Sequence, residues 1–271
     1  MAEITAAMVK ALREETGQGM MECKKALGET NGDVEAAKDL LRVRGQVKAE
    51  KKASRAASEG LIEIVSSADN KAATMVEVSS ETDFTARNDV FKDMVAQVAN
   101  LASGEPAGVI AATGAIKAAI QVAFTKIGEN MSFVRGIKLA GDAVASYKHH
   151  NSKVGVLLAI AGSADMALLR EVCMHIAFKN PLGIRREDIP ADVVEREKAV
   201  AKAQAVEQGK PEAIAEKMVV GKVNKFYQEI CLLEQAFVKD ETKTIKEVLG
   251  SAKVLGFARY EVGGQTEASA Q

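Results

Sequence analysis

The stretch LIEIVSSADNKAATMVEV, residues 61–78, contains two runs of strand-forming residues separated by a turn signal. The runs Leu61–Val65 and Ala73–Val78 consist mainly of β-branched and other apolar residues, a composition typical of strands. Asp69 and Asn70 lie between the runs, and both residue types favour tight turns. The stretch therefore predicts a β-hairpin.

The polar segment SSETDFTARND, residues 79–89, follows the hairpin as a predicted loop and holds one large apolar side chain, Phe84. In one interpretation, Phe84 is a staple residue that packs onto the following helix. In the other it is an exposed wedge beside Asp83, because exposed aromatic side chains on loops make effective interface anchors. The spacing of the residues leaves both interpretations open.

A small sheet with a covering helix is predicted twice after residue 60. In the first unit, apolar residues at helical spacing over 90–101 predict a helix, and 132–139 predicts a third strand. In the second unit, the strand 154–162 precedes a helix that Pro181 ends, and the strand 257–262 comes late. We therefore predict an α+β fold with two related units that contain small antiparallel sheets.

Three short helical segments precede the hairpin and predict a small bundle with a thin core. Thr5 and Asp33 are expected to cap the first and third helices, Gly17 to end the first, and the third to end near Gly45. A stripe of basic residues follows at helical spacing. It is either the solvated face of a linker helix or a docking surface for an acidic partner, and it consists of Lys48, Lys51, Lys52 and Arg55.

Two long charged segments, 191–208 and 212–233, interrupt the second unit and are joined by Gly209, Lys210 and Pro211. They predict a projecting antiparallel helical hairpin, a short coiled coil. The predicted domains are an N-terminal helical domain (1–45), a helical linker (46–59), two core units (60–142 and 143–262), the hairpin inserted in the second unit (191–233) and a polar tail (263–271).

Composition limits the classes of partner. The 271 residues carry a formal net charge of −1, only 4% of them are aromatic and Trp is absent, which argues against direct binding of nucleic acid. The three cysteines lie far apart without a CxxC pair, as expected in a reducing cytosol. Because there is no signal-peptide core and no apolar run of membrane-spanning length, we expect a cytoplasmic protein without membrane contact.

The common sequence signatures of enzymes are absent. There is no P-loop, no GxGxxG motif after a strand and no HExxH motif. His149 and His150 have no second pair of ligands at metal spacing. Cys173 and His175 are two residues apart on a predicted helix, so their side chains point to different faces. We therefore expect no catalytic residue, no bound metal and no cofactor.

Five segments together resemble one family, in the order in which that family carries them. They are TGQGMMECKKAL (16–27), NGDVEAA (31–37), TDFTAR (82–87), KIGEN (126–130) and GKPEAIAEKMV (209–219). On these segments the chain resembles the bacterial elongation factor Ts family. The resemblance implies a small N-terminal domain like a ubiquitin-associated domain, a two-part α+β core and a projecting helical hairpin.

The resemblance also implies a function in protein synthesis, that of a guanine-nucleotide exchange factor rather than an enzyme. Such a factor binds elongation factor Tu in its GDP and nucleotide-free forms, displaces magnesium and promotes GDP release, so that GTP can bind. The motif that enters the GTPase corresponds here to Thr82, Asp83, Phe84 and Thr85. Family members commonly carry Val at the last of these positions, so the motif is slightly altered in this chain.

Further contacts are implied at other positions. The N-terminal docking residues of the family map onto Leu12, Met20 and Met21, and two histidines that contact the GTPase in relatives match His149 and His175. The hairpin is expected to join two copies of the chain or to meet another partner. Some relatives carry a helix after the last strand that touches the GTPase, and that contact is expected to be missing or reduced here.

Two alternative functions stay open on the sequence. The first is a protein-binding adaptor of the ubiquitin-associated kind that has no exchange activity. The second is an RNA-binding helical protein that uses the basic stripe of residues 48–55 and the hairpin.

Overall fold

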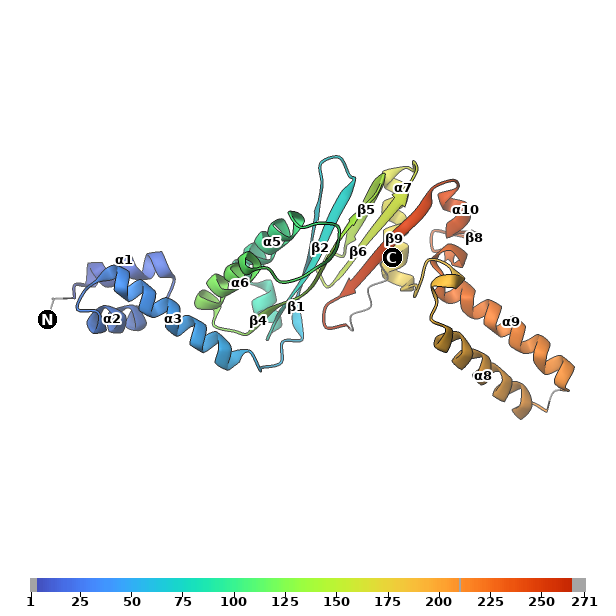
Figure 1. Cartoon of the computed structure of the whole chain (residues 1–271), viewed down its shortest axis with the longest axis horizontal. Coiled ribbons are helices and arrows are strands. Elements are labelled where there is room, and N and C mark those ends of the chain that lie inside the picture. The colour runs from blue at the N-terminus through green and yellow to red at the C-terminus, as the bar shows by residue number, and fades with distance from the viewer. Residues whose placement is uncertain (1–3, 210, 265–271) are drawn as a thin grey trace.

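The computed structural model describes residues 4–209 and 211–264. The described chain is elongated, with a helical bundle at one end, two sheets in the middle and a helical hairpin at the other end (Figure 1). Helices and antiparallel strands form separate layers, so the predicted α+β fold class is confirmed.

The N-terminal bundle consists of α1 (Ala6–Thr16), α2 (Met20–Glu29) and α3 (Val34–Lys52). The predicted caps are confirmed: the side chains of Thr5 and Asp33 accept hydrogen bonds from the first turns of α1 and α3, and α1 ends at Gly17 in the left-handed region. The bundle core is small and consists of Val9, Leu12, Cys23, Ala26, Leu27, Ala37 and Leu41.

Helix α3 does not end near Gly45, so that prediction was wrong; the helix continues to Lys52. Gly45 is buried where α3 passes helix α6 (Gly114–Ile127), and a Cβ atom there would lie 3.5 Å from the Thr125 side chain. That distance is an ordinary van der Waals contact, so Gly45 is a buried interior position of the helix and does not end it. Leu41 belongs to the bundle core and Ala49 packs on the core of the first unit, so one face of α3 serves both cores.

The first unit is a four-stranded antiparallel sheet in the order β1-β2-β4-β3. The predicted hairpin is present as β1 (Glu59–Ser66) and β2 (Ala72–Ser80), and Asn70 has a φ of 56° in its turn. β4 (Met131–Ala140) pairs with β2, and the short strand β3 (Gly108–Ile110) was not predicted. Helices α5 (Asp89–Ser103) and α6 (Gly114–Ile127) cover one face.

The second unit is a three-stranded antiparallel sheet of β5 (Ala143–Lys148), β6 (Val154–Ala161) and β9 (Lys253–Glu261), in the order β5-β6-β9. Helix α7 (Met166–Lys179) packs on its outer face. The inner face packs on the first sheet through a shared apolar layer. The middle of the molecule is thus a stack of helices, sheet, sheet and helix (Figure 1).

The predicted helical hairpin is confirmed as α8 (Ala191–Glu207) and α9 (Glu212–Ile230). Lys210 in its joint and the tail 265–271 lie outside the described residues. The base of the hairpin contains short elements that were not predicted: two 3-10 turns (Arg186–Asp188 and Leu232–Glu234), β7 (Ala236–Phe237), β8 (Asp240–Thr244) and α10 (Ile245–Leu249).

Candidate partner-binding site

The segment predicted as a loop after β2 contains a short helix, α4 (Asp83–Arg87). Thr82 is its N-cap, because its hydroxyl accepts a hydrogen bond from the Thr85 N–H at 3.2 Å. Asn88 ends α4 and caps α5, since its side chain accepts from the Val90 N–H at 2.8 Å. The segment is therefore a single helical turn held at both ends.

Phe84 lies on the outer side of this turn with 79% of its surface exposed. The interpretation in which it packs onto the following helix is therefore wrong for this structure. Burying such a ring removes a large apolar area from water, so an exposed Phe is a strong candidate for contact with a partner.

The residues on either side of Phe84 differ in exposure. Asp83 is half-exposed and forms an ion pair with Arg87 at 3.0 Å, one helical turn away. Thr85 is buried together with Ala86 against the first unit. The expectation that Thr85 faces a partner is therefore not met, because in a helical turn the residue after an exposed position rotates toward the protein.

A carboxylate that the sequence did not single out holds the start of the turn. Glu129, between α6 and β4, accepts hydrogen bonds from the Thr82 N–H at 3.2 Å and from its hydroxyl at 3.0 Å. The two residues are 47 positions apart in the chain. Glu129 lies in the KIGEN segment, which was noted for its resemblance to the family, but nothing in the sequence connected that segment with Thr82.

The N-terminal candidates differ in exposure. Met20 and Met21 are 50% and 75% exposed at the start of α2, so both remain available to a partner. Leu12 is fully buried in the bundle core, which corrects the expectation that it contacts a partner. The sequence did not single out Val43 and Val47, which are exposed one turn apart on α3 and line a groove with residues of α2.

The basic stripe makes contacts within the chain. Lys48 forms an ion pair with Glu22 of α2, and Lys52 donates to the Gly128 carbonyl after α6. Arg55 forms an ion pair with Glu81 at 3.4 Å. Lys48 therefore joins two helices of the bundle, and Lys52 and Arg55 join α3 and the linker to the first unit. These contacts weaken the interpretation of the stripe as a docking surface.

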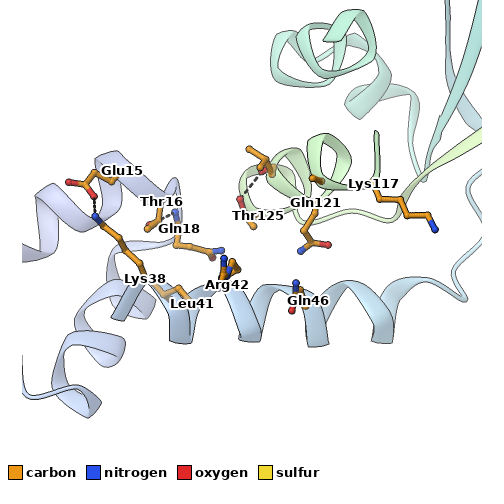
Figure 2. Close-up of a pocket in the computed structure, with 12 residues that line it drawn as sticks. Glu15, Thr16, Gln18, Lys38, Leu41, Arg42, Gln46, Lys117, Gln121 and Thr125 are labelled. Carbon is orange, nitrogen blue, oxygen red and sulfur yellow. Dashed lines mark hydrogen bonds and ion pairs between the residues drawn. The ribbon is translucent and has the colours of Figure 1, made fainter. Parts of the chain in front are cut away.

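A pocket lined mainly by polar and charged residues lies between the bundle and the first unit (Figure 2). Arg42 and Gln46 of α3 face Gln121 and Thr125 of α6 across it. The Gln121 amide nitrogen is buried without a hydrogen-bond partner in the protein. Polar side chains of α3 and α6 thus line the space beside Gly45.

The two candidate histidines occupy different environments. His149, in the turn after β5, is partly buried and its Nδ1 lies 2.7 Å from the Tyr147 hydroxyl. His175 on α7 is fully buried between Gln235 and the backbone of Val238, at 2.9 and 3.3 Å. His175 has no exposed surface, so the expected direct contact with a GTPase is not available to it.

The described residues contain no group of three or more His, Cys, Asp or Glu side chains arranged to hold a metal ion. The three thiols, Cys23, Cys173 and Cys231, are buried, and burial raises the pKa of Cys173 far above its ordinary value. Within 4–209 and 211–264, no helix is both long and apolar enough to span a membrane.

Comparison with known proteins identifies the family. The family model described as elongation factor TS matches residues 81–264. Elongation factor Ts of Bartonella henselae is 45% identical over 97% of this chain and 94% of its own length. The proteins of the same name from Agrobacterium fabrum and Sinorhizobium medicae are 46% and 45% identical, over 98% and 96% of this chain and 95% and 91% of their own lengths. With these matches over nearly the whole chain, the protein belongs to the elongation factor Ts family of translation elongation factors.

Proposed function

We propose that this protein is a guanine-nucleotide exchange factor that binds elongation factor Tu carrying GDP and promotes release of the nucleotide. Membership of the elongation factor Ts family supports the proposal. The structural observation that carries it is Phe84, a large apolar side chain 79% exposed on a turn that is capped at both ends.

In this proposal, Phe84 and the half-exposed carboxylate of Asp83 enter the GTPase domain and disturb the site that holds magnesium. GDP bound together with a metal ion loses affinity when the metal and the phosphate loop are displaced. The distortion is supplied by the binding energy of the factor, so factor and nucleotide weaken each other's binding by the same coupling free energy. GTP then binds the nucleotide-free complex and releases the factor. No covalent bond is made or broken, so no catalytic residue is required.

A second contact is proposed at the N-terminal end of the molecule, through Met20 and Met21 on the bundle. Both side chains are exposed, and flexible Met side chains adapt to a partner surface. Two separate contacts suit an exchange factor, because the complex stays together while Phe84 distorts the nucleotide site. We place this activity in the cytoplasm, where translation elongation takes place.

The helical hairpin is proposed to join two copies of the chain. Val206 and Val220 on its two helices are 66% and 61% exposed, beside a groove lined by α8 and α9. An identical apolar surface on a second copy could cover them in a symmetric contact. Sedimentation equilibrium of the free protein tests this, and a concentration-independent monomer mass would contradict it.

The exchange proposal is tested by release of a fluorescent GDP analogue from elongation factor Tu. Substoichiometric amounts of the protein should accelerate release, and the protein alone should not hydrolyse GTP. Release that is unchanged over a wide range of protein concentration would show that the proposed function is wrong. Filter binding at varied salt tests the alternative RNA-binding function, which predicts tight, salt-sensitive retention of RNA.

A further inference from the structure

The segment between α6 and β4 holds the turn that carries Phe84. The Glu129 carboxylate accepts the Thr82 N–H at 3.2 Å and the Thr82 hydroxyl at 3.0 and 3.2 Å. The same hydroxyl oxygen accepts the Thr85 N–H at 3.2 Å and so begins α4. Glu129 therefore fixes the residue whose side chain starts the helical turn.

The neighbouring residue joins the same turn to the linker that follows α3. The Asn130 N–H donates to the Glu81 carboxylate at 2.6 Å, and its side-chain amide donates to the carbonyls of Ala53 and Arg55 at 3.3 and 2.8 Å. Arg55 in turn pairs with Glu81 at 3.4 Å. The linker, the end of β2 and the segment 128–130 thus form a closed hydrogen-bonded ring.

The orientation of the Phe84 side chain depends on this hydrogen-bonded ring, because few contacts of the side chain itself fix its position. The ring of Phe84 is almost entirely in solvent, so packing within the chain does not fix its position. Its backbone lies in a helix of five residues, which is too short to be stable by itself. The burial of Thr85 and Ala86 anchors one side of the turn, and the N-cap at Thr82, with the groups that hold Thr82, fixes its start.

We propose that Glu129 is a positioning residue for nucleotide exchange, which keeps Phe84 in the orientation that reaches the magnesium site of the GTPase. The proposal rests on the exchange function proposed above. An orientation set before binding avoids the cost of ordering the turn in the complex. Asn130 extends the same control to the linker, so that the turn is held in a fixed relation to the bundle.

Two substitutions at Glu129 should give graded effects. Glu129→Gln keeps the size and one acceptor oxygen, so one of the two hydrogen bonds to Thr82 can survive. Glu129→Ala removes both. Since misplacement of a reacting group by about 1 Å can cost roughly 100-fold in rate, we expect the GDP-release rate at saturating protein to fall roughly tenfold or more for Ala and less for Gln. The affinity of the complex should fall much less, because the bundle and the rest of the surface are unchanged.

Conservative changes at Thr82 provide an independent test of the same bonds. Thr82→Ser retains the hydroxyl, so amide exchange at 82–87 in the free protein should stay slower than in Thr82→Val, which retains the shape and loses the hydroxyl. Thr82→Val should lower the GDP-release rate as Glu129→Ala does. Glu241→Gln is the matched control, because Glu241 is an exposed carboxylate on β8 in the other core unit. It should change neither rate nor affinity.

The readouts separate this proposal from the exchange function. Amide hydrogen exchange at 82–87 in the free protein should become faster in Glu129→Gln, and this measurement needs no partner. If the wild type fails to release GDP, the exchange function is wrong while the amide measurement still decides whether Glu129 holds the turn. A Glu129→Ala protein with wild-type release at saturation, or a loss confined to affinity, would overturn the positioning role. If Glu129→Ala does not fold, Glu129→Gln and Thr82→Val decide the question alone.

Discussion

The guanidinium carbon of Arg135 in β4 lies 4.2 Å from the centre of the Tyr260 ring in β9, so a charge of the first sheet rests on an aromatic face of the second. The same guanidinium donates to the Glu77 carboxylate at 2.7 Å and to the Glu261 carbonyl at 3.0 Å. Both members of the ion pair are almost fully buried. This cluster joins the two core units through polar contacts set within an apolar layer.

Removing one member of this pair should destabilise the protein strongly. Arg135→Ala leaves the Glu77 charge buried without its partner, which typically costs about 3–5 kcal/mol. Replacing both residues with Met should be far milder, because no buried charge is then left unpaired. Urea unfolding measured by circular dichroism gives these free energies.

The control for this prediction is the Lys148–Glu63 pair, which joins β5 of the second unit to β1 of the first and is partly exposed. Glu63→Gln should cost no more than about 1 kcal/mol, as for other solvent-screened pairs. If Arg135→Ala costs no more than this control, the buried cluster around Arg135 does not stabilise the fold more than a partly exposed pair does.

Phe84→Ala should separate function from stability. Because the ring is exposed, the free energy of unfolding should change by less than about 0.5 kcal/mol, whereas a core Phe would cost about 3–5 kcal/mol. GDP release at saturating protein should fall at least roughly tenfold, as expected for an aromatic anchor residue. Thermal melting and GDP-release kinetics measure the two effects.

Phe178→Ala is the matched control, since Phe178 on α7 is 76% exposed. It removes the same side chain at nearly equal exposure and should leave the release rate unchanged. A Phe84→Ala protein that melts early but exchanges normally when folded would refute the wedge interpretation.

Leu12 and Met21 should give opposite results although both were expected at the same interface. Leu12→Ala empties a buried position and should cost about 2–5 kcal/mol within the bundle. Met21→Ala should leave bundle stability within about 0.5 kcal/mol and weaken binding to elongation factor Tu. Amide hydrogen exchange of α1–α3 reports bundle stability, and titration calorimetry reports binding. Unchanged affinity of Met21→Ala would exclude a docking role for this side chain.

Because His175 is buried, its protonation should make the stability of the protein depend on pH. Burial lowers its pKa below the ordinary value of 6.5, the Gln235 hydrogen bond opposes this shift and the Lys179 charge adds to it. The unfolded chain then binds a proton more readily than the folded chain, so this contribution is present above about pH 6.5 and is lost as the pH falls below that value. The hydrogen bonds fit a neutral ring with its proton on Nε2, because the Val238 N–H donates to Nδ1.

Urea unfolding between pH 7.5 and 5 should therefore show a decrease that is smaller in His175→Gln. His150→Gln is the comparison, because His150 is exposed. A wild-type decrease that persists in full in His175→Gln would assign it to other groups.

Local features of the fold could be read from the sequence, whereas contacts between distant segments could not. The caps Thr5 and Asp33 act within one helical turn, so residue type and spacing are sufficient to identify them. Gly45 was misread because a glycine can end a helix or occupy its interior, and the residue type alone does not distinguish the two. Strands of two or three residues, such as β3 and β7, carry too few side chains to form a pattern.

The candidate site shows the same limit. The exposure of Phe84 and the burial of Thr85 follow from the rotation of a single helical turn, which a polar segment of this length does not specify. Glu129 was missed because its partner, Thr82, is 47 residues away and belongs to another motif. The carried-over residues Leu12 and His175 are buried, so sequence similarity identified the positions without revealing which side chains reach the surface.

Because α3 continues without a break from the bundle to the first unit, it fixes the rotation of the bundle about the helix axis relative to the core. Leu41, Gly45 and Ala49 recur at four-residue intervals, and the helix turns by about 100° per residue. One inserted residue would swing Met20 and Met21 about a quarter of a turn around the axis relative to Phe84, while shifting them by only about 1.5 Å along it. An insertion of seven residues, close to two full turns, would nearly restore their direction and move them about 10 Å farther away. The direction of Met20 and Met21 and their distance from Phe84 can therefore be varied separately, by the number of residues inserted into α3.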